Sequence, residues 1–453
     1  MKEKRLLLIN PVSNLIISMI DKRYRFPPLN LAYVAALTPT DWEVALIDEN
    51  FDRFEYQECD LVALTAFTST APRAYEIASI YRKHGIHTVI GGIHASMLLD
   101  EALNYVDTVV IGEAESTWPR LISDFVSHKM QQVYRGEWLE LSNLVQPRRD
   151  LFNKKYVFGV IQTSRGCPMD CEFCSVSAFN GHRYRQRPVD EVLDELETVP
   201  QKLIFFVDDN IIGYGNENRA IELFEGMIKR KIRKQWFCQA SLNFADNEEV
   251  LKLASRAGCR MAFIGIEAED VDALKEVGKK INLRRKYDEC FKQINRHKIA
   301  VLGAFIGGMD ADNKERLLKR ADYIINSRGI NVIQWSLLTP LPGTRLFDKL
   351  EREKRLLYTN FPNDWERYGW TQVVYKPAQM TADELLAVAE KCASRVYSYR
   401  SILRKFFMTF YETRSIITAL WSFFFNMTYR KVIIRWRASL RAIKKPSVMV
   451  GTG

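Results

Sequence analysis

The sequence predicts an α/β protein with three parts: an N-terminal doubly wound, Rossmann-like domain, a central partial (β/α)6 barrel and a C-terminal helical extension. Up to about residue 345, short continuous apolar runs alternate with helix-like stretches, which is typical of parallel strands covered on both faces. A low-regularity stretch interrupts this alternation once, and beyond residue 345 the strand-like runs stop. The expected parts are a domain at 1–140, a linker at 141–155, a barrel at 156–345 and the extension at 346–453.

The N-terminal domain is predicted from five short apolar runs. They lie at 5–10, 43–49, 61–67, 87–92 and 107–113. Ligands of doubly wound sheets bind beyond the carboxyl ends of the strands, and glycine there lets the backbone approach a ligand closely. The candidate ligand-binding residues at these ends are Thr65, Thr68, Ser69, Gly91, Gly92, His94, Gly112 and Glu113.

The barrel is predicted from six further runs with helices between them. They lie at 156–164, 202–209, 235–241, 260–267, 300–308 and 331–340. In such barrels the chemistry is carried by residues at the carboxyl ends of the strands. The residues of interest at these ends are Asp208, Asp209, Gln239, Ser241, Gly265 and Glu267.

Eight cysteines are present, and three of them, Cys167, Cys171 and Cys174, lie within the stretch RGCPMDCEFC. The opening residues MKEKRLLLINPV have an apolar run too short for a signal peptide and fit a first strand. We therefore expect a reducing, cytoplasmic location, where clustered cysteines indicate a metal or redox site.

Three thiolates on one loop would leave one iron of a 4Fe–4S cluster open, and an open metal position is typical of a catalytic site. A zinc site is the alternative, with His182 as the fourth ligand. Chance clustering in a core is disfavoured, because Pro168, Asp170 and Glu172 interleave the cysteines.

The Cys-x3-Cys-x-aromatic-Cys pattern, with Phe173 before the third cysteine, resembles the radical SAM superfamily. The resemblance implies that the open iron chelates S-adenosylmethionine. It also implies that the cluster, reduced by an external ferredoxin- or flavodoxin-type donor, cleaves this cofactor to a 5′-deoxyadenosyl radical. It further implies a cofactor-binding role for Glu267 and, with it, Phe173, Gly265, Gln239, Ser241, Asp208 and Asp209. For the two aspartates the alternative is helix capping and structure at the barrel end.

The segments PPLNLAYVAAL, VALIDEN, GGIHAS and VVIGEAESTWPRLISDF resemble the cobalamin-binding domain of B12-dependent radical SAM proteins. The resemblance assigns the eight N-terminal candidates to cobalamin binding and implies methyl transfer to an unactivated carbon. The Asp-x-His-x-x-Gly motif that ligates cobalt in base-off enzymes is absent, which leaves the lower ligand open, with His94 a candidate. The alternative is a scaffold that has lost its corrinoid.

The extension carries the excess positive charge. Residues 395–445 hold twelve Lys or Arg and one acid, Glu412, whereas the whole chain has a net charge of +10. The stretch SIITALWSFFFNMTY (415–429) is uncharged but too short to span a bilayer. We expect a helix lying in a membrane interface, so that the protein is peripheral on the inner face of a membrane. A helical cap on the barrel and, less favoured, nucleic-acid binding are the alternatives, and no nucleic-acid partner is expected.

The tail resembles the C-terminal extension of hopanoid methylases and related lipid-modifying members, which implies a small hydrophobic substrate. A polycyclic or isoprenoid lipid or a chlorophyll-type tetrapyrrole would fit. The leading prediction is therefore a cobalamin-dependent C-methyltransferase. Radical cyclisation, oxidation or carbon–carbon coupling without methyl transfer is the second interpretation, and a cofactor-binding sensor without turnover is the third. Finally, the arginine-rich RYRQR (183–187) after the cysteines is interpreted as a solvated face, as a group that meets an anionic substrate or as a group that closes the site.

Overall fold

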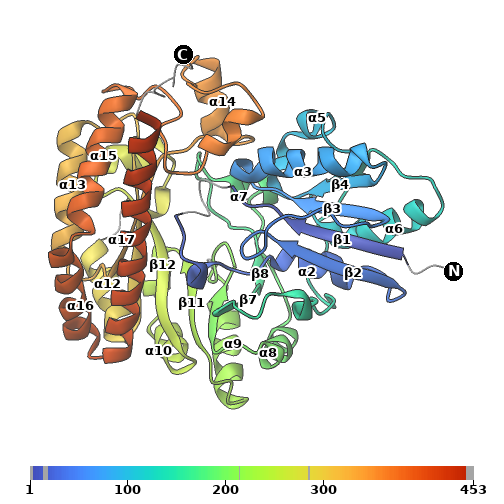
Figure 1. Ribbon diagram of the computed structural model, residues 1–453. Helices are drawn as coiled ribbons and strands as arrows, with labels where there is room; N and C mark the ends of the chain where they lie inside the picture. The colour runs from blue at the N-terminus through green and yellow to red at the C-terminus, as the bar shows by residue number, and fades with distance from the viewer. Residues whose placement is uncertain (1–3, 14–18, 214, 284–285, 445–453) are drawn as a thin grey trace, which may run out of the picture.

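The structure, a computed structural model, describes residues 4–13, 19–213, 215–283 and 286–444. Two parallel sheets, each of six strands, lie beside one another, and a layer of C-terminal helices flanks the second (Figure 1). The predicted fold class is therefore confirmed.

The first sheet has the strand order β2-β1-β3-β4-β5-β6, with every pair parallel. Its strands are β1 (Lys4–Asn10), β2 (Trp42–Asp48), β3 (Leu61–Thr65), β4 (His87–Gly91), β5 (Thr108–Ile111) and β6 (Val133–Arg135). Five match the predicted runs. The sixth, β6, lies between the last predicted run and the expected linker and has only three residues, so no apolar run indicates it.

Helices cover both faces of this sheet, as the continuous apolar strands require. One face packs on α3 (Ala71–Lys83), α4 (Ile93–Met97) and α5 (Leu99–Ala102), and the other on α2 (Leu29–Ala36) and α6 (Trp118–Val126). All five residues of β3 are buried, which shows the double coverage directly.

The second sheet has the order β14-β13-β12-β11-β10-β7 and is also wholly parallel. Its strands are β7 (Phe158–Ile161), β10 (Leu203–Phe206), β11 (Gln235–Ala240), β12 (Cys259–Glu267), β13 (Ala300–Gly307) and β14 (Val332–Leu337). One face is covered by α8 (Val189–Thr198), α9 (Glu217–Lys229), α10 (Glu248–Arg256), α12 (Tyr287–Arg296) and α13 (Lys314–Asn326). This is the predicted partial barrel, and its carboxyl-terminal strand ends are called the mouth below.

The extension folds into α15 (Ala382–Val396), α16 (Tyr399–Thr413) and α17 (Ile416–Lys444). Trp421 and Phe425 of α17 pack with Phe158 and Phe237 on the sheet face opposite the barrel helices. The helical-cap interpretation is therefore correct for this side of α17. No helix in the described part of the chain is long and apolar enough to cross a membrane.

Short elements connect these layers. They are β8 (Ser164–Arg165) paired with β9 (Arg185–Gln186), α7 (Ser175–Asn180), α11 (Val271–Glu276), α14 (Arg345–Arg352), and the 3-10 helices η1 (Lys22–Tyr24), η2 (Thr68–Thr70), η3 (Ala114–Ser116), η4 (Arg149–Leu151), η5 (Leu242–Ala245), η6 (Lys280–Asn282) and η7 (Asn363–Arg367). Helix α4 follows β4 and contacts α7, which follows the three cysteines. The strand ends of the first sheet therefore meet the cysteine-bearing segment.

Candidate active site at the junction of the two sheets

The cysteine loop begins at a position that only glycine can occupy. Gly166 has φ of 87°, and a Cβ there would lie 2.1 Å from the carbonyl oxygen of Arg183. Its backbone N–H donates to Asp209 Oδ2 at 2.9 Å. The backbone conformation between β8 and the cysteine loop is therefore fixed at Gly166. At the other end of the loop, Cys174 is the N-cap residue of α7.

The three thiols lie close enough to influence one another electrostatically, and each is at least half-buried. Burial raises the pKa of Cys167 and raises that of Cys171 to about 11, while Lys279 opposes both shifts. Thiols with raised pKa values stay protonated at neutral pH, so metal binding must displace these protons. The loop therefore offers three sulfur ligands, and binding of a metal centre there should release protons.

The zinc alternative requires ligands that converge on one ion. His182, its proposed fourth ligand, is exposed and lies near Met169 O and Asp170 instead. Within the described ranges no three His, Cys, Asp or Glu side chains are placed around a single ion. An iron–sulfur cluster takes one cysteine per iron, so its ligands need not converge on a single ion.

Asp208 and Asp209 at the end of β10 hold the cysteine loop. Asp208 is fully buried, and its Oδ1 accepts hydrogen bonds from Thr163 N at 3.0 Å and from Ser164 Oγ at 2.5 Å. Burial raises the pKa of Asp208 and raises that of Asp209 to about 6. These contacts are those of the structural alternative, whereas Asp208 Oδ2 has no partner among the described residues. A cofactor-binding role for the two aspartates stays a prediction.

Glu267 ends β12 in an unusual conformation. Its φ is 65°, a region few non-glycine residues adopt, and the register with β13 shifts there. Its Oε1 lies 2.9 Å from Lys279 Nζ, and both side chains are almost completely buried. A Cβ on Gly265 would lie 2.4 Å from this oxygen, so the glycine makes room for the pair. Unusual backbone of this kind is concentrated at functional sites.

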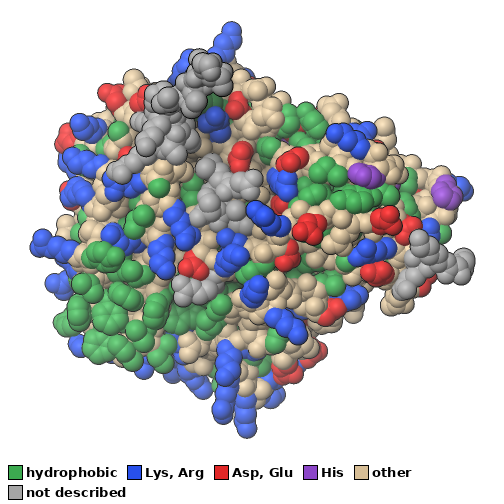
Figure 2. Space-filling model, in the orientation of Figure 1, with side chains coloured by type: hydrophobic (Ala, Val, Ile, Leu, Met, Phe, Trp, Pro, Cys, Tyr) green, Lys and Arg blue, Asp and Glu red, His purple; other side chains and the backbone are tan. Residues whose placement is uncertain are grey.

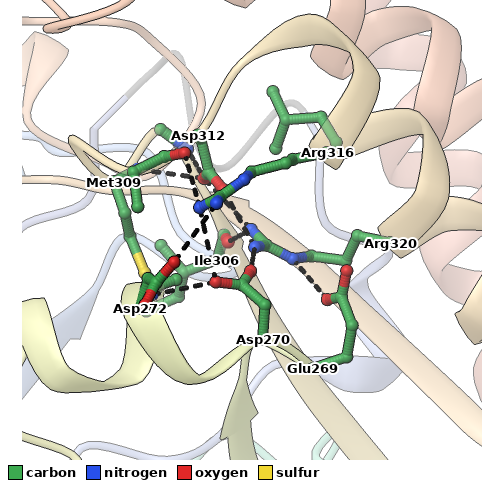
Figure 3. Close-up of polar contacts among 12 residues, drawn as sticks. Glu269, Asp270, Asp272, Ile306, Met309, Asp312, Arg316 and Arg320 are labelled. Atoms are coloured by element: carbon green, nitrogen blue, oxygen red, sulfur yellow. Dashed lines mark hydrogen bonds and ion pairs between the residues drawn. The ribbon is translucent and has the colours of Figure 1, made fainter.

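A buried arginine braces the loop that follows Glu267 (Figure 3). Arg320 of α13 is fully buried and binds Glu269 at 2.7 Å, Asp270 at 2.9 Å and Asp312 at 2.9 Å. Its guanidinium also donates to the carbonyl oxygen of Ile306 at 2.8 Å. Because these partners follow β12 and β13, Arg320 ties two neighbouring strand ends of the mouth together.

On the first sheet, the predicted ligand-binding residues gather at the strand ends. Thr65, Thr68 and Ser69 are buried, and Asn30 donates to Thr65 Oγ1 at 2.7 Å. Gly92 has φ of 99°, and a Cβ there would lie 2.9 Å from Ala66 O. The remaining two glycines, Gly91 and Gly112, end β4 and follow β5.

Glu113 links this edge to the cysteine segment. Its carboxylate lies 3.2 Å from Arg165 Nη1 and accepts from Arg185 Nη1 at 3.0 Å, and Arg165 also pairs with Glu115. All four side chains are at least four-fifths buried. Arg187 is likewise buried against Glu195, so the solvated-face interpretation of 183–187 is wrong for Arg185 and Arg187. Because both arginines are paired with carboxylates of the protein, the site-closing interpretation is favoured over contact with an anionic substrate.

Family models match both halves of this junction: a B12 binding domain at residues 19–122 and the radical SAM superfamily at residues 161–324. A curated relative, bacteriochlorophyllide d C-12(1)-methyltransferase of Chlorobaculum tepidum, is 32% identical over 89% of this chain and 89% of its own. The chain belongs to the cobalamin-dependent branch of the radical SAM superfamily.

Two further comparisons agree. Hopanoid C-2 methylase of Rhodopseudomonas palustris is 29% identical over 84% of this chain and 73% of its own. The structure of OxsB, a cobalamin-dependent S-adenosylmethionine radical enzyme, superposes with a TM-score of 0.69 at 14% identity, covering 98% of this chain and 80% of that one. The family prediction is confirmed, and with it the cofactors: a 4Fe–4S cluster, S-adenosylmethionine and cobalamin.

For a radical SAM enzyme the geometry fits the cluster at Cys167, Cys171 and Cys174. Of the other predicted cofactor residues, Gln239 Nε2 donates to Asp208 O at 3.1 Å, and Ser241 Oγ accepts from Asn210 at 3.2 Å. Phe173 packs in the apolar cluster under α14. All three therefore lie at the mouth, and their contact with S-adenosylmethionine stays a prediction.

His94 has another partner in this cobalamin-binding domain. It is buried, its Nε2 lies 3.1 Å from Glu101 Oε1, and Trp365 Nε1 donates to the same carboxylate at 2.8 Å. Tyr75 completes the group. The contacts make His94 part of a tie between the first sheet and η7. Its role as a cobalt ligand stays a prediction.

Sequence reasoning missed two residues of interest. Lys279 lies twelve residues beyond Glu267, and the chain returns it to Glu267 through α11, a reversal that no sequence pattern marks. Phe67 lies two residues beyond the end of β3, between Thr65 and Thr68, and is 67% exposed. An exposed aromatic ring among candidate ligand-binding residues suits a flat macrocycle, and its position at the end of the apolar run 61–67 was the available signal.

Proposed function

We propose that this radical SAM enzyme is a cobalamin-dependent C-methyltransferase that acts on an unactivated carbon of a hydrophobic metabolite. The observation that carries the proposal is the junction itself: α4 contacts α7, and Glu113 pairs with Arg165 and Arg185. When bound, cobalamin supplies the methyl group, and the cluster with S-adenosylmethionine supplies the hydrogen-abstracting radical. A junction that holds both sets of residues supports a reaction that needs both.

The chain's own residues have separable tasks in this proposal. The three cysteines bind iron, and the Asp209 contact to Gly166 holds their loop. Glu267 and Lys279 present an anion and a cation side by side in a buried place, which suits an amino acid zwitterion such as the methionine part of S-adenosylmethionine. Arg320 keeps Glu267 in place by bracing the next residues of its loop. The low exposure of these groups excludes water from the reaction.

The proposed substrate is a tetrapyrrole of the bacteriochlorophyllide kind or, second, a polycyclic isoprenoid lipid of the hopanoid kind. The printed activities of the two curated relatives support this class. We further propose a ferredoxin- or flavodoxin-type electron donor and a peripheral position at the inner face of a membrane.

Radical cyclisation, oxidation or coupling without methyl transfer is not favoured, because three relatives that match 84–89% of the chain at 26–32% identity are named as methyltransferases or methylases. Two cyclases match less of the chain, 72%, at 24–25% identity. The sensor interpretation is set aside on the same ground. The test uses protein made anaerobically with cobalamin, iron and reductant, incubated with S-adenosylmethionine and each candidate substrate. Methyl transfer predicts equal amounts of 5′-deoxyadenosine, S-adenosylhomocysteine and methylated product. Deoxyadenosine with a product but without S-adenosylhomocysteine would overturn methyl transfer and leave the radical chemistry.

A matched pair of variants controls this test. Cys174→Ala removes a cluster ligand, and Cys59→Ala removes a buried cysteine from the core of the first sheet. Products should vanish in the first variant and persist in the second. Persistence of products in Cys174→Ala would contradict the cluster assignment itself.

A further inference from the structure

The outer faces of α16 and α17 form a large exposed apolar patch around the turn that joins them. Figure 2 shows apolar side chains gathered at the lower left of the molecule, where Figure 1 places the lower ends of these two helices. The exposed large apolar side chains there are Leu403, Phe407, Phe410, Tyr411, Ile416, Ile417, Leu420 and Phe424. These eight residues are called the hairpin patch below.

The two helices that carry the hairpin patch are fixed to the rest of the protein by hydrogen bonds. On the opposite sides of the same helices, Asn426 Nδ2 donates to Asn331 O at 2.8 Å and Thr418 Oγ1 donates to Lys298 O at 2.7 Å. Thr409 of α16 is fully buried and contacts Ser422 of α17 at 3.3 Å. The helices are therefore held in place by polar contacts on their inner sides, while their outer apolar faces remain in solvent. A contiguous exposed patch of this kind marks an interaction site.

The charges on the two helices near the patch are mostly positive. Arg400 and Arg404 of α16, Arg414 in the turn before α17, and Lys298 beside the start of α17 are exposed. Glu412 is the single acid in residues 399–428. Arg414 lies over the ring of Tyr411, 4.7 Å from its centroid, so a cation stands directly at the edge of the patch.

We propose that the hairpin patch docks this enzyme on the surface of a bilayer that contains anionic lipids. Apolar side chains would enter the boundary between headgroups and acyl chains, and the arginines would contact the lipid phosphates. A second copy of the chain fits less well, because a patch-to-patch contact would bring like charges together. The inference rests on the peripheral position proposed above and assigns it to one surface, and it does not depend on methyl transfer.

The site of attachment fixes the orientation of the enzyme. Thr418 contacts Lys298, which lies just before β13, whereas the cysteines lie at the opposite ends of the strands. The eight residues of β13 alone separate the two levels by about 25 Å. The hairpin patch on a bilayer would therefore leave the mouth and the cobalamin-binding domain away from the lipid surface.

The test is flotation of the full-length, cofactor-loaded protein with vesicles of phosphatidylcholine alone and with added phosphatidylglycerol. We expect binding to the anionic vesicles. Phe407→Ser combined with Phe424→Ser should weaken it at least about tenfold, since each exposed phenylalanine would lose its burial in lipid. The matched control is Val271→Ser with Leu357→Ser, two exposed apolar residues outside the patch, which should bind as wild type does. Far-UV circular dichroism and iron content check that both double variants are folded.

A second pair of variants tests the charge argument. Arg404→Gln with Arg414→Gln should reduce the preference for phosphatidylglycerol and the sensitivity of binding to salt. Binding that none of the patch variants changes would overturn the proposal. Failure of the wild-type protein to bind vesicles would also overturn it. If light scattering then showed a dimer that the two serine substitutions dissociate, the patch would be a self-association surface.

Discussion

The barrel mouth and the C-terminal helical layer each bury a lysine, and they treat it in opposite ways. Lys279 at the mouth is paired with Glu267 at 2.9 Å, and Lys405 on α16 donates to Ser327 O at 2.7 Å. Burial alone would lower the pKa of Lys279, but Glu267 and Cys171 raise it above its ordinary value. Burial lowers the pKa of Lys405 to about 7.

The difference separates a functional region from a supporting one. The mouth contains buried opposite charges, glycines at which any side chain would clash, and a backbone of positive φ at Glu267. Such features lower stability and are typical of ligand-binding sites. The helical layer buries a charge only against a backbone carbonyl. Substitutions at the mouth should therefore affect cofactors most, and those in the helical layer should affect stability.

The largest expected effect is the loss of the metal centre. Cys171→Ala should reduce bound iron from about four atoms per chain to nearly none, because the remaining two thiolates cannot hold the cluster. Iron and sulfide analysis after anaerobic reconstitution measures this. Lys405→Met, from the helical layer, should keep its iron. Equal iron loss in both would remove the distinction between the two regions.

The second effect tests the tight entry to the cysteine loop. Gly166→Ala should lower the free energy of unfolding by roughly 3 kcal/mol or more and impair cluster assembly, since its Cβ would lie 2.1 Å from Arg183 O. Gly85→Ala is the control, because φ is similar at 73° but nothing lies within 4 Å of the added Cβ. It should cost only about 1 kcal/mol. Chemical denaturation measures the free energy of unfolding, and iron content measures cluster assembly. A similar loss of stability in the two variants would show that the loop around Gly166 relaxes to accommodate the added Cβ.

Much of this mouth could be predicted from sequence, because its main signals are local. Continuous apolar runs predicted parallel strands, and the spacing of Cys167, Cys171 and Cys174 predicted the cluster loop. The pairing of Lys279 with Glu267 and of Arg165 with Glu113 depends on segments brought together by the fold, so no local pattern revealed it. The inner and outer faces of α17 could not be separated either, since aromatic residues such as Phe424 and Phe425 occur on both.

The third effect concerns the electrostatics of the mouth. Lys279→Met should lower the reduction potential of the cluster by on the order of 50 mV, because a nearby cation stabilises the added electron. Redox titration followed by electron paramagnetic resonance measures it without turnover. Lys280→Met removes an exposed neighbouring charge and should change the potential much less. An unchanged reduction potential in Lys279→Met would show that the charge of Lys279 stabilises Glu267 and has no effect on the cluster.

The smallest effect lies in the helical layer and depends on pH. The folded protein releases the Lys405 proton near pH 7, while the unfolded chain holds it to about pH 10.4. The unfolded state thus binds more protons between these values, so this lysine destabilises the fold below pH 7 and the penalty fades as pH rises. Lys405→Met should be more stable than wild type by on the order of 2 kcal/mol at pH 7, after loss of the Ser327 hydrogen bond.

Denaturant titrations of Lys405→Met and wild type at pH 6, 8 and 10 check this prediction. The advantage of the variant should shrink as pH rises. A constant difference across the range would show that Lys405 is not neutralised by folding.

The position of helix α17 affects how the protein folds during synthesis. Its Trp421 and Phe425 cover Phe158 and Phe237, residues that are synthesised more than 180 positions earlier. Until α17 leaves the ribosome, only the early residues Tyr24 and Phe26 can pack on this inner face of the sheet, and the part that Trp421 and Phe425 cover stays exposed. Late, long-range closure of this kind is slow and exposes the growing chain to aggregation. The sheet can therefore form before its inner face is fully covered.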